Sequence, residues 1–211
     1  MKVPGKERIL EAALALITKR GGADVTMAQI ANAARMSRQA VYLHFADRGD
    51  LFVAMVRYTD ERRGLAAEIQ TIRDAPSGIE AMRRMVSLQA RTNHEIWAPA
   101  NILDAARRTD AAAERSWQDR LQHRLSGCRD IMRRVEQDGD LLPGIDVETA
   151  ADLLWTITSL RMWEDLVLQR RWSARRYEDY VFGLLQRSLT RTGESTTPNH
   201  PRPTSNSRKP E

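Results

Sequence analysis

Four polar side chains close together in the chain have the chemistry of nucleic-acid recognition. They are Arg38, Gln39, Tyr42 and His44, all within residues 37–45. Arginine can donate two parallel hydrogen bonds to guanine, and glutamine can pair in the same way with adenine. Tyrosine can bind a phosphate or a base edge. A helix that presented these side chains on its outer face could therefore read a DNA sequence.

The surrounding residues predict two short helices joined by a tight turn. Thr26 and Gln29 are spaced as a capping box, in which each side chain binds the other residue's backbone N–H at the start of a helix. Ser37 is a suitable cap for the second helix. The apolar positions recur at helical spacing and should face inward: Met27, Ile30, Ala31, Ala34, Ala40, Val41 and Phe45. This layout is typical of a helix-turn-helix; a plain helical hairpin with a solvated outer face is the alternative.

Residues 7–55 resemble the DNA-binding unit of TetR-family transcriptional regulators. The resemblance rests on the runs RILEAALALITKRGG, VTMAQIANAA and MSRQAVYLHFADRGDLF. Three positions depart from the family pattern. Arg35 stands where the family usually has glycine, so the turn must either accept a positive φ there or change its geometry. Arg48 and Gly49 stand where the family usually has lysine and glutamate. Together with the exposed chemistry, the resemblance implies these DNA contacts: Thr26, Arg35, Ser37, Arg38, Gln39, Tyr42, His44 and Arg48. Arg38 and Gln39 are expected to read bases, and the other residues to bind phosphates or support the helix.

Composition restricts the class of protein. The 211 residues carry 33 basic and 28 acidic side chains, for a net charge of +5. The single cysteine, Cys128, excludes an intrachain disulfide and fits a cytoplasmic protein. It falls on an apolar helical stripe, so a buried small side chain is favoured over a reactive thiol. No apolar stretch is long enough to span a membrane.

The rest of the chain predicts a helical body. Apolar spacing, caps and breakers place further helices at about 6–20, 48–73, 77–95, 99–108, 111–138, 147–170 and 173–191. With the two short helices, this makes an all-α fold of about nine helices. We expect a DNA-binding domain over residues 1–64, with its motif at about 27–46, and a regulatory and dimerisation domain over 65–192. The proline-rich residues 193–211 are expected to be a disordered tail.

The last two helices carry surplus apolar surface, which suits a symmetric contact between two chains. The resemblance implies the same homodimer, bound to a partly palindromic operator in double-stranded DNA. It also implies an unidentified small-molecule effector that enters the body and releases a repressor from DNA. Residues with suitable chemistry to line that site are Trp97, Asn101, Trp117, Trp155 and Arg161, with His94 at its rim.

Other functions have less support from the residues. The chain has no zinc-protease helix signature, phosphate-binding glycine loop or paired His and Cys ligands, so no enzyme, cofactor or metal site is predicted. A TetR-like activator remains an alternative to a repressor. So does a helical protein-interaction module, although that module would not need Arg38, Gln39 and Tyr42 on one outer face.

Overall fold

The computed structural model describes residues 5–19 and 25–191, and the regular secondary structure in these residues is helical apart from one isolated bridge between Leu141 and Thr190. The elements are α1 (Gly5–Lys19), α2 (Met27–Ala33), α3 (Arg38–Tyr42), α4 (Arg48–Arg62), α5 (Leu65–Arg73), α6 (Gly78–Ala106), α7 (Ala111–Gln137), α8 (Val147–Ile157), α9 (Leu160–Trp163), the π-helical η1 (Glu164–Gln169) and α10 (Ala174–Leu189). The all-α class expected from the sequence is therefore confirmed. The predicted tail at 193–211 lies outside the described residues.

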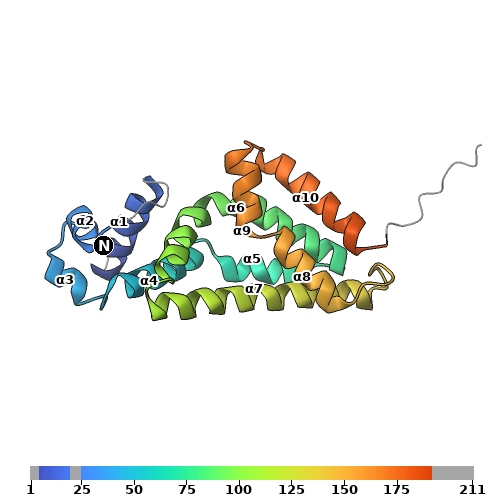
Figure 1. Ribbon diagram of the computed structural model, residues 1–211, viewed down its shortest axis with the longest axis horizontal. Coiled ribbons are helices and arrows are strands. Elements are labelled where there is room, and N and C mark those ends of the chain that lie inside the picture. Colours follow the sequence, from blue (N-terminus) through green and yellow to red (C-terminus); the bar gives the residue numbers. More distant parts are fainter. Residues whose placement is uncertain (1–4, 20–24, 192–211) are drawn as a thin grey trace, which may run out of the picture.

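The molecule is elongated, with α1 to α3 at one end and α7 running along the body (Figure 1). We call α1 to α3 with the first turns of α4 the head. Its buried cluster includes Ile9, Ile30, Phe45 and Leu51, and it extends to Leu103 of α6. A second cluster fills the body between α6, α7, α8 and α10. Head and body thus share packing, so the predicted division at residue 64 stays a prediction about function.

The helix expected over residues 48–73 is two helices. Gly64 adopts a left-handed conformation with a φ of 62° and separates α4 from α5. Left-handed backbone costs other residues about 1–2 kcal/mol, so a glycine can end a helix whose apolar spacing continues beyond it. The apolar pattern alone therefore could not show this break.

The break expected at Pro99 is absent, because α6 continues through this proline to Ala106. A proline inside a helix removes one backbone hydrogen bond and costs about 3 kcal/mol. Pro99 is buried, and neighbouring Ala98 and Ile102 pack into the cluster of the head. Tertiary packing compensates for the lost hydrogen bond.

The helix expected over residues 147–170 is interrupted after Ile157. The Thr158 hydroxyl donates to the Leu154 carbonyl at 2.6 Å, and Ser159 begins α9 by accepting from the Met162 N–H at 3.2 Å. The chain then continues into the π-helical η1. This interruption changes which side chains of residues 158–170 face the interior of the body.

Candidate nucleic-acid interface and regulatory body

The capping box predicted for α2 is present. The Thr26 hydroxyl accepts from the Gln29 N–H at 3.3 Å, and the Gln29 side chain accepts from the Thr26 N–H at 3.0 Å. Ser37 caps α3 by accepting from the Ala40 N–H at 3.1 Å. These local bonds satisfy free N–H groups at the start of each helix. The two helices therefore begin where the sequence predicts.

The turn between α2 and α3 keeps the geometry of a glycine turn although arginine occupies it. Arg35 has a φ of 52°. Its N–H donates to the Asn32 carbonyl at 3.1 Å, and the Met36 N–H donates to the Ala31 carbonyl at 3.0 Å. This pair of bonds is a Schellman motif, in which glycine normally takes the left-handed position. Gly139 does so at the end of α7, with a φ of 79°.

The outer face of α3 carries the polar side chains predicted to contact DNA. Arg38, Gln39 and Tyr42 are exposed, whereas Val41 and Phe45 are buried in the head. The sequence did not single out Leu43, which is 86% exposed at the end of α3. The sequence offered one indication of this exposure, because Leu43 lies two residues from each of the inward-facing Val41 and Phe45. A leucine exposed there can contact a thymine methyl group, which is one of the apolar features of the major groove.

The remaining predicted DNA contacts surround α3. His44 is exposed beside Gly5 at the start of α1. Arg48 is half-buried in the first turn of α4, with its guanidinium 5.6 Å from the centre of the Phe52 ring. Asp47 caps this helix by accepting from the Asp50 N–H at 2.8 Å. The start of α4 is thus held next to the end of α3.

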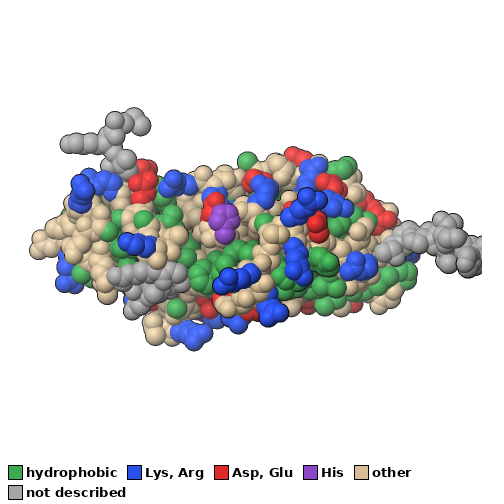
Figure 2. Space-filling model, turned by 90° about the horizontal axis from the view of Figure 1, so that it is seen from above, with side chains coloured by type: hydrophobic (Ala, Val, Ile, Leu, Met, Phe, Trp, Pro, Cys, Tyr) green, Lys and Arg blue, Asp and Glu red, His purple; other side chains and the backbone are tan. Residues whose placement is uncertain are grey.

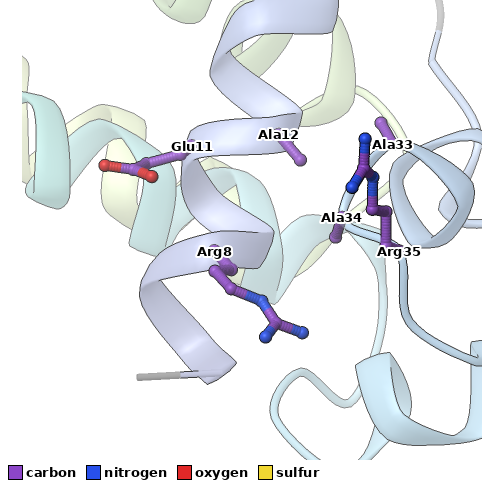
Figure 3. A pocket seen from close by; sticks show the side chains of 6 residues that line it. All are labelled: Arg8, Glu11, Ala12, Ala33, Ala34 and Arg35. Carbon is purple, nitrogen blue, oxygen red and sulfur yellow. The ribbon is translucent and has the colours of Figure 1, made fainter. Parts of the chain in front are cut away.

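A shallow cleft of about 460 Å³ lies between α1 and the turn. Figure 3 shows the side chains of Arg8 and Arg35 on the cleft side of α1, while Glu11 points to the other side. Glu11 accepts a hydrogen bond from Tyr58 at 3.0 Å and lies 3.7 Å from Arg62. Glu11 is one of the residues that line the cleft, but its carboxylate is bound by side chains of α4, whereas Arg8 and Arg35 bring two positive charges to the cleft.

Two of the predicted effector contacts point away from the body's interior. The Arg161 side chain is 76% exposed and lies 3.6 Å from Glu164 and 3.4 Å from Asp165. The expectation that it lines a pocket assumed an unbroken helix through Thr158, and the interruption there turns it outward. His94 is also exposed, 3.6 Å from Glu95.

The other four predicted contacts divide between the two clusters. Trp117 packs against the cluster of the head, Trp155 against that of the body, and Trp97 against both. Asn101 is half-buried. The indole N–H groups of Trp97 and Trp155 are buried without a hydrogen-bond partner. The structure therefore brings Trp97 and Trp155 to the body's interior, but it does not assemble all six residues in one place.

An inward polar residue that the sequence analysis did not single out is Arg124. It lies on α7 at helical spacing from Leu121 and Cys128, so an arginine interrupting an apolar stripe was the available signal.

No described helix is long and apolar enough to cross a membrane. In the same residues, no group of three His, Cys, Asp or Glu side chains could hold a metal ion.

Known proteins match both the head and the whole fold. The family model "Bacterial regulatory proteins, tetR family" matches residues 9–55. The transcriptional repressor Rv1474c of Mycobacterium tuberculosis is 28% identical over 134 residues, which are 63% of this chain and 66% of the repressor. The chain thus spans just under two thirds of this relative.

Two solved structures share the overall fold. A transcriptional regulator from Saccharomonospora viridis in complex with choline has a TM-score of 0.74 at 18% identity, covering 88% of this chain and 97% of its own. AibR, in complex with isovaleryl coenzyme A and operator DNA, has a TM-score of 0.65 at 21% identity, covering 85% and 97%. With the capped helices and the Schellman turn, these findings match residues 9–55 to the tetR family of bacterial regulatory proteins and give the whole chain the fold of these two regulators.

Proposed function

We propose that the protein is a sequence-specific DNA-binding repressor that acts in the cytoplasm as a homodimer and leaves its operator when a small molecule binds the body. The proposal rests on the two faces of α3 and the residues that follow it. Arg38, Gln39 and Tyr42 are exposed on one face, whereas Val41 and the following Phe45 are buried. The operator DNA in the AibR complex supports the DNA-binding half of the mechanism, and the small molecules bound in both structural relatives, isovaleryl coenzyme A and choline, support the other half.

The proposed dimer surface is an apolar stripe of three exposed side chains, Leu153 on α8 with Tyr180 and Leu184 on α10. Figure 2 shows hydrophobic side chains reaching the surface of the body between its charged groups. Exposed apolar groups gathered on two neighbouring helices mark a protein contact. A twofold dimer through this stripe would present two heads, which must match major grooves about 34 Å apart on one face of the DNA.

The experiment that tests the function is selection of bound sequences from random duplex DNA, with the full-length protein and no added ligand. We expect an inverted repeat, because a symmetric dimer reads two equivalent half-sites. Enrichment of no sequence would contradict the proposal and would favour the protein-interaction alternative. A reporter gene under the selected repeat then separates a repressor from an activator.

Replacing Arg38 with alanine is expected to relax one position of each half-site. Arg38 is exposed at the start of α3, where a guanidinium can pair with guanine in the major groove. Loss of such a pair costs about 1–3 kcal/mol of discrimination between bases. The selection, repeated with Arg38→Ala, measures this loss as a base preference that disappears at one position. An unchanged preferred sequence would show that α3 is oriented differently on DNA.

Replacing Arg48 with alanine is expected to weaken binding to all sequences alike. Arg48 is the first residue of α4, which follows α3 in the chain, and we expect it to contact a phosphate rather than a base. Each phosphate contact contributes roughly 0.9 to the slope of log K against log salt, so the slope should fall by about one unit per protomer contact. Titrations of the selected repeat and of random duplex over several salt concentrations measure it. A change confined to the selected repeat would contradict a phosphate contact.

Replacing Arg35 with glycine is expected to separate folding from DNA binding. Glycine relieves the left-handed conformation but is more disordered when unfolded, so the free energy of unfolding should rise by at most about 1 kcal/mol. Binding to DNA should weaken, with a lower salt slope, because a cation beside the turn is lost. Urea denaturation and DNA titration measure the two effects.

A matched control for Arg35 is available in the body. Arg171 also has a left-handed conformation, with a φ of 56°, but it follows η1, remote from the head. Arg171→Gly should give a similar change in stability without any change in the salt dependence of DNA binding. If both variants bound DNA as the unaltered protein does, Arg35 would have no role in the interface.

A further inference from the structure

Arg124 is half-buried on α7, on the side of the helix that faces Thr158 and Trp155. Its side chain donates to the carbonyl and the hydroxyl of Thr158, both at 3.3 Å, and its guanidinium lies 4.6 Å from the centre of the Trp155 ring. Among the described residues, no carboxylate lies within ion-pair distance of it, although many other arginines of the chain have such a partner. A guanidinium stays protonated in proteins, so this charge needs another form of compensation.

The titratable neighbours of Arg124 do not supply that compensation. Burial raises the pKa of the Cys128 thiol to about 11 and that of the Tyr177 hydroxyl to about 12. Both groups are therefore neutral near pH 7. Burial also lowers the pKa of Arg124 itself, which reflects the cost of holding the charge there. The carbonyl of Thr158, at the end of α8, offers only a fraction of a negative charge.

Three buried hydrogen-bond donors without partners lie in the same part of the body, and two of them, on Trp155 and Tyr177, belong to residues that interact with Arg124. The Tyr177 hydroxyl and the indole N–H groups of Trp155 and Trp163 are buried, and each lacks a hydrogen-bond partner. Tyr177 and Trp163 belong to the same buried cluster as Cys128, one turn from Arg124 on α7. More than nine in ten buried polar groups in proteins are satisfied, so several free donors beside one uncompensated cation require an explanation.

The chemistry of these groups defines what would satisfy them. All of them donate hydrogen bonds and one is a cation, so the complementary ligand is an anion with at least two acceptor atoms. A planar carboxylate can accept two parallel bonds from a guanidinium. A phosphate group carries about −1.5 to −2 charges at neutral pH, more than a single arginine balances. The indole rings and the apolar cluster suit a hydrocarbon or aromatic remainder.

We propose that the effector of this protein is a carboxylate with an apolar body, whose carboxyl group binds Arg124 and the Tyr177 hydroxyl beside Trp155. The proposal rests on the ligand-controlled function above and specifies the class of ligand. The carboxylate also joins α7, which carries Arg124, to α10, which carries Tyr177. Arg124 already binds the segment between α8 and α9 through Thr158, so the site lies where three parts of the body meet.

The test compares carboxylates with their uncharged amides on the full-length protein. Octanoate, benzoate and phenylacetate are each paired with the corresponding amide, and inorganic phosphate serves as a second comparison. We expect at least one carboxylate to raise the melting temperature and to alter the tryptophan fluorescence, while its amide and phosphate do neither. A carboxylate and its amide acting equally, phosphate acting as strongly, or no carboxylate acting at all would overturn the proposal.

Two variants assign the effect to the site. Arg124→Met should weaken carboxylate binding by on the order of 10- to 100-fold, since a bond to a charged group is lost. It should also raise the melting temperature without ligand, because an uncompensated buried charge is removed. Tyr177→Phe removes only a hydroxyl that has no partner, so it should fold normally and bind carboxylates roughly 3- to 10-fold more weakly.

The matched control is Arg129→Met on the same helix, where the guanidinium lies 2.6 Å from Glu148. This variant should respond to carboxylates as the unaltered protein does. If Arg124→Met and Tyr177→Phe bound carboxylates as strongly as the unaltered protein, the assignment to this site would be overturned. The DNA selection described above uses no ligand, so a failure here leaves the proposed DNA-binding function standing, and a failure there leaves a carboxylate-binding site without its regulatory role.

Discussion

Replacing Leu184 with glutamate is expected to convert the protein to a monomer and to weaken its binding to an inverted repeat at least about 100-fold. Leu184 is 38% exposed on α10, one helical turn from Tyr180, which is 61% exposed. In the proposed dimer both side chains would be buried, and a glutamate there would lose its hydration without gaining a partner. Because Leu184 is accessible to solvent in the single chain, the fold of each protomer should persist.

The large expected effect on DNA binding arises because a monomer has one head and can bind only one half-site at a time. Two linked heads bind successive half-sites with an effective concentration that a single head lacks. Sedimentation gives the mass of the variant, and titrations compare an inverted repeat with a single half-site. Ile69→Glu is the matched control, because Ile69 is 37% exposed but lies on α5, outside the apolar stripe. A Leu184→Glu protein that remained dimeric would place the dimer surface elsewhere.

The head could be predicted from the sequence because its determinants are local. The partners of Thr26 and Ser37 are three residues away in the chain, so residue types at fixed spacing suffice to recognise both caps. Arg35 was ambiguous, since a non-glycine residue could either adopt a left-handed conformation or change the turn. The structure shows the first outcome, with the Met36 N–H bonded to the Ala31 carbonyl.

The body could be predicted only in outline, because its details depend on contacts between distant residues. Pro99 remains inside α6 because the helix packs against the head, and Arg161 turns outward because α8 ends at Ile157. Apolar spacing predicts neither result. Arg124 was visible as a polar residue on an apolar stripe, but its lack of a carboxylate partner is a three-dimensional fact. The sequence therefore indicated a helical body, but it could not show which of the predicted effector contacts face its interior.

Gly49 is a further departure from the family pattern that only the structure explains. A Cβ atom at this position would overlap Oδ2 and Cγ of Asp110. Asp110 caps α7, where its Oδ1 accepts from the N–H groups of Ala112 at 2.8 Å and Ala113 at 2.9 Å. The carboxylate therefore has little freedom to move, and a glycine in α4 allows α7 to begin directly against the head.

Replacing Gly49 with alanine is accordingly expected to lower the free energy of unfolding by about 2–4 kcal/mol. Overpacking costs about 1–3 kcal/mol, and displacing a helix cap costs about 0.5–2 kcal/mol. Urea denaturation measures the change. Gly127→Ala on α7 is the matched control, since a Cβ there meets nothing within 4 Å and alanine should instead stabilise the helix by up to about 1 kcal/mol.

A double variant shows whether Asp110 causes the cost. In a protein that already carries Asp110→Gly, the added methyl group at Gly49 has room, so Gly49→Ala should be neutral or slightly stabilising there. An equal loss in both backgrounds would mean that another neighbour of Gly49 is responsible. A loss confined to the Asp110 background would establish that the carboxylate of Asp110 leaves no room for a side chain in the first turn of α4. The junction between reading head and body would then depend on a glycine that the family pattern does not have.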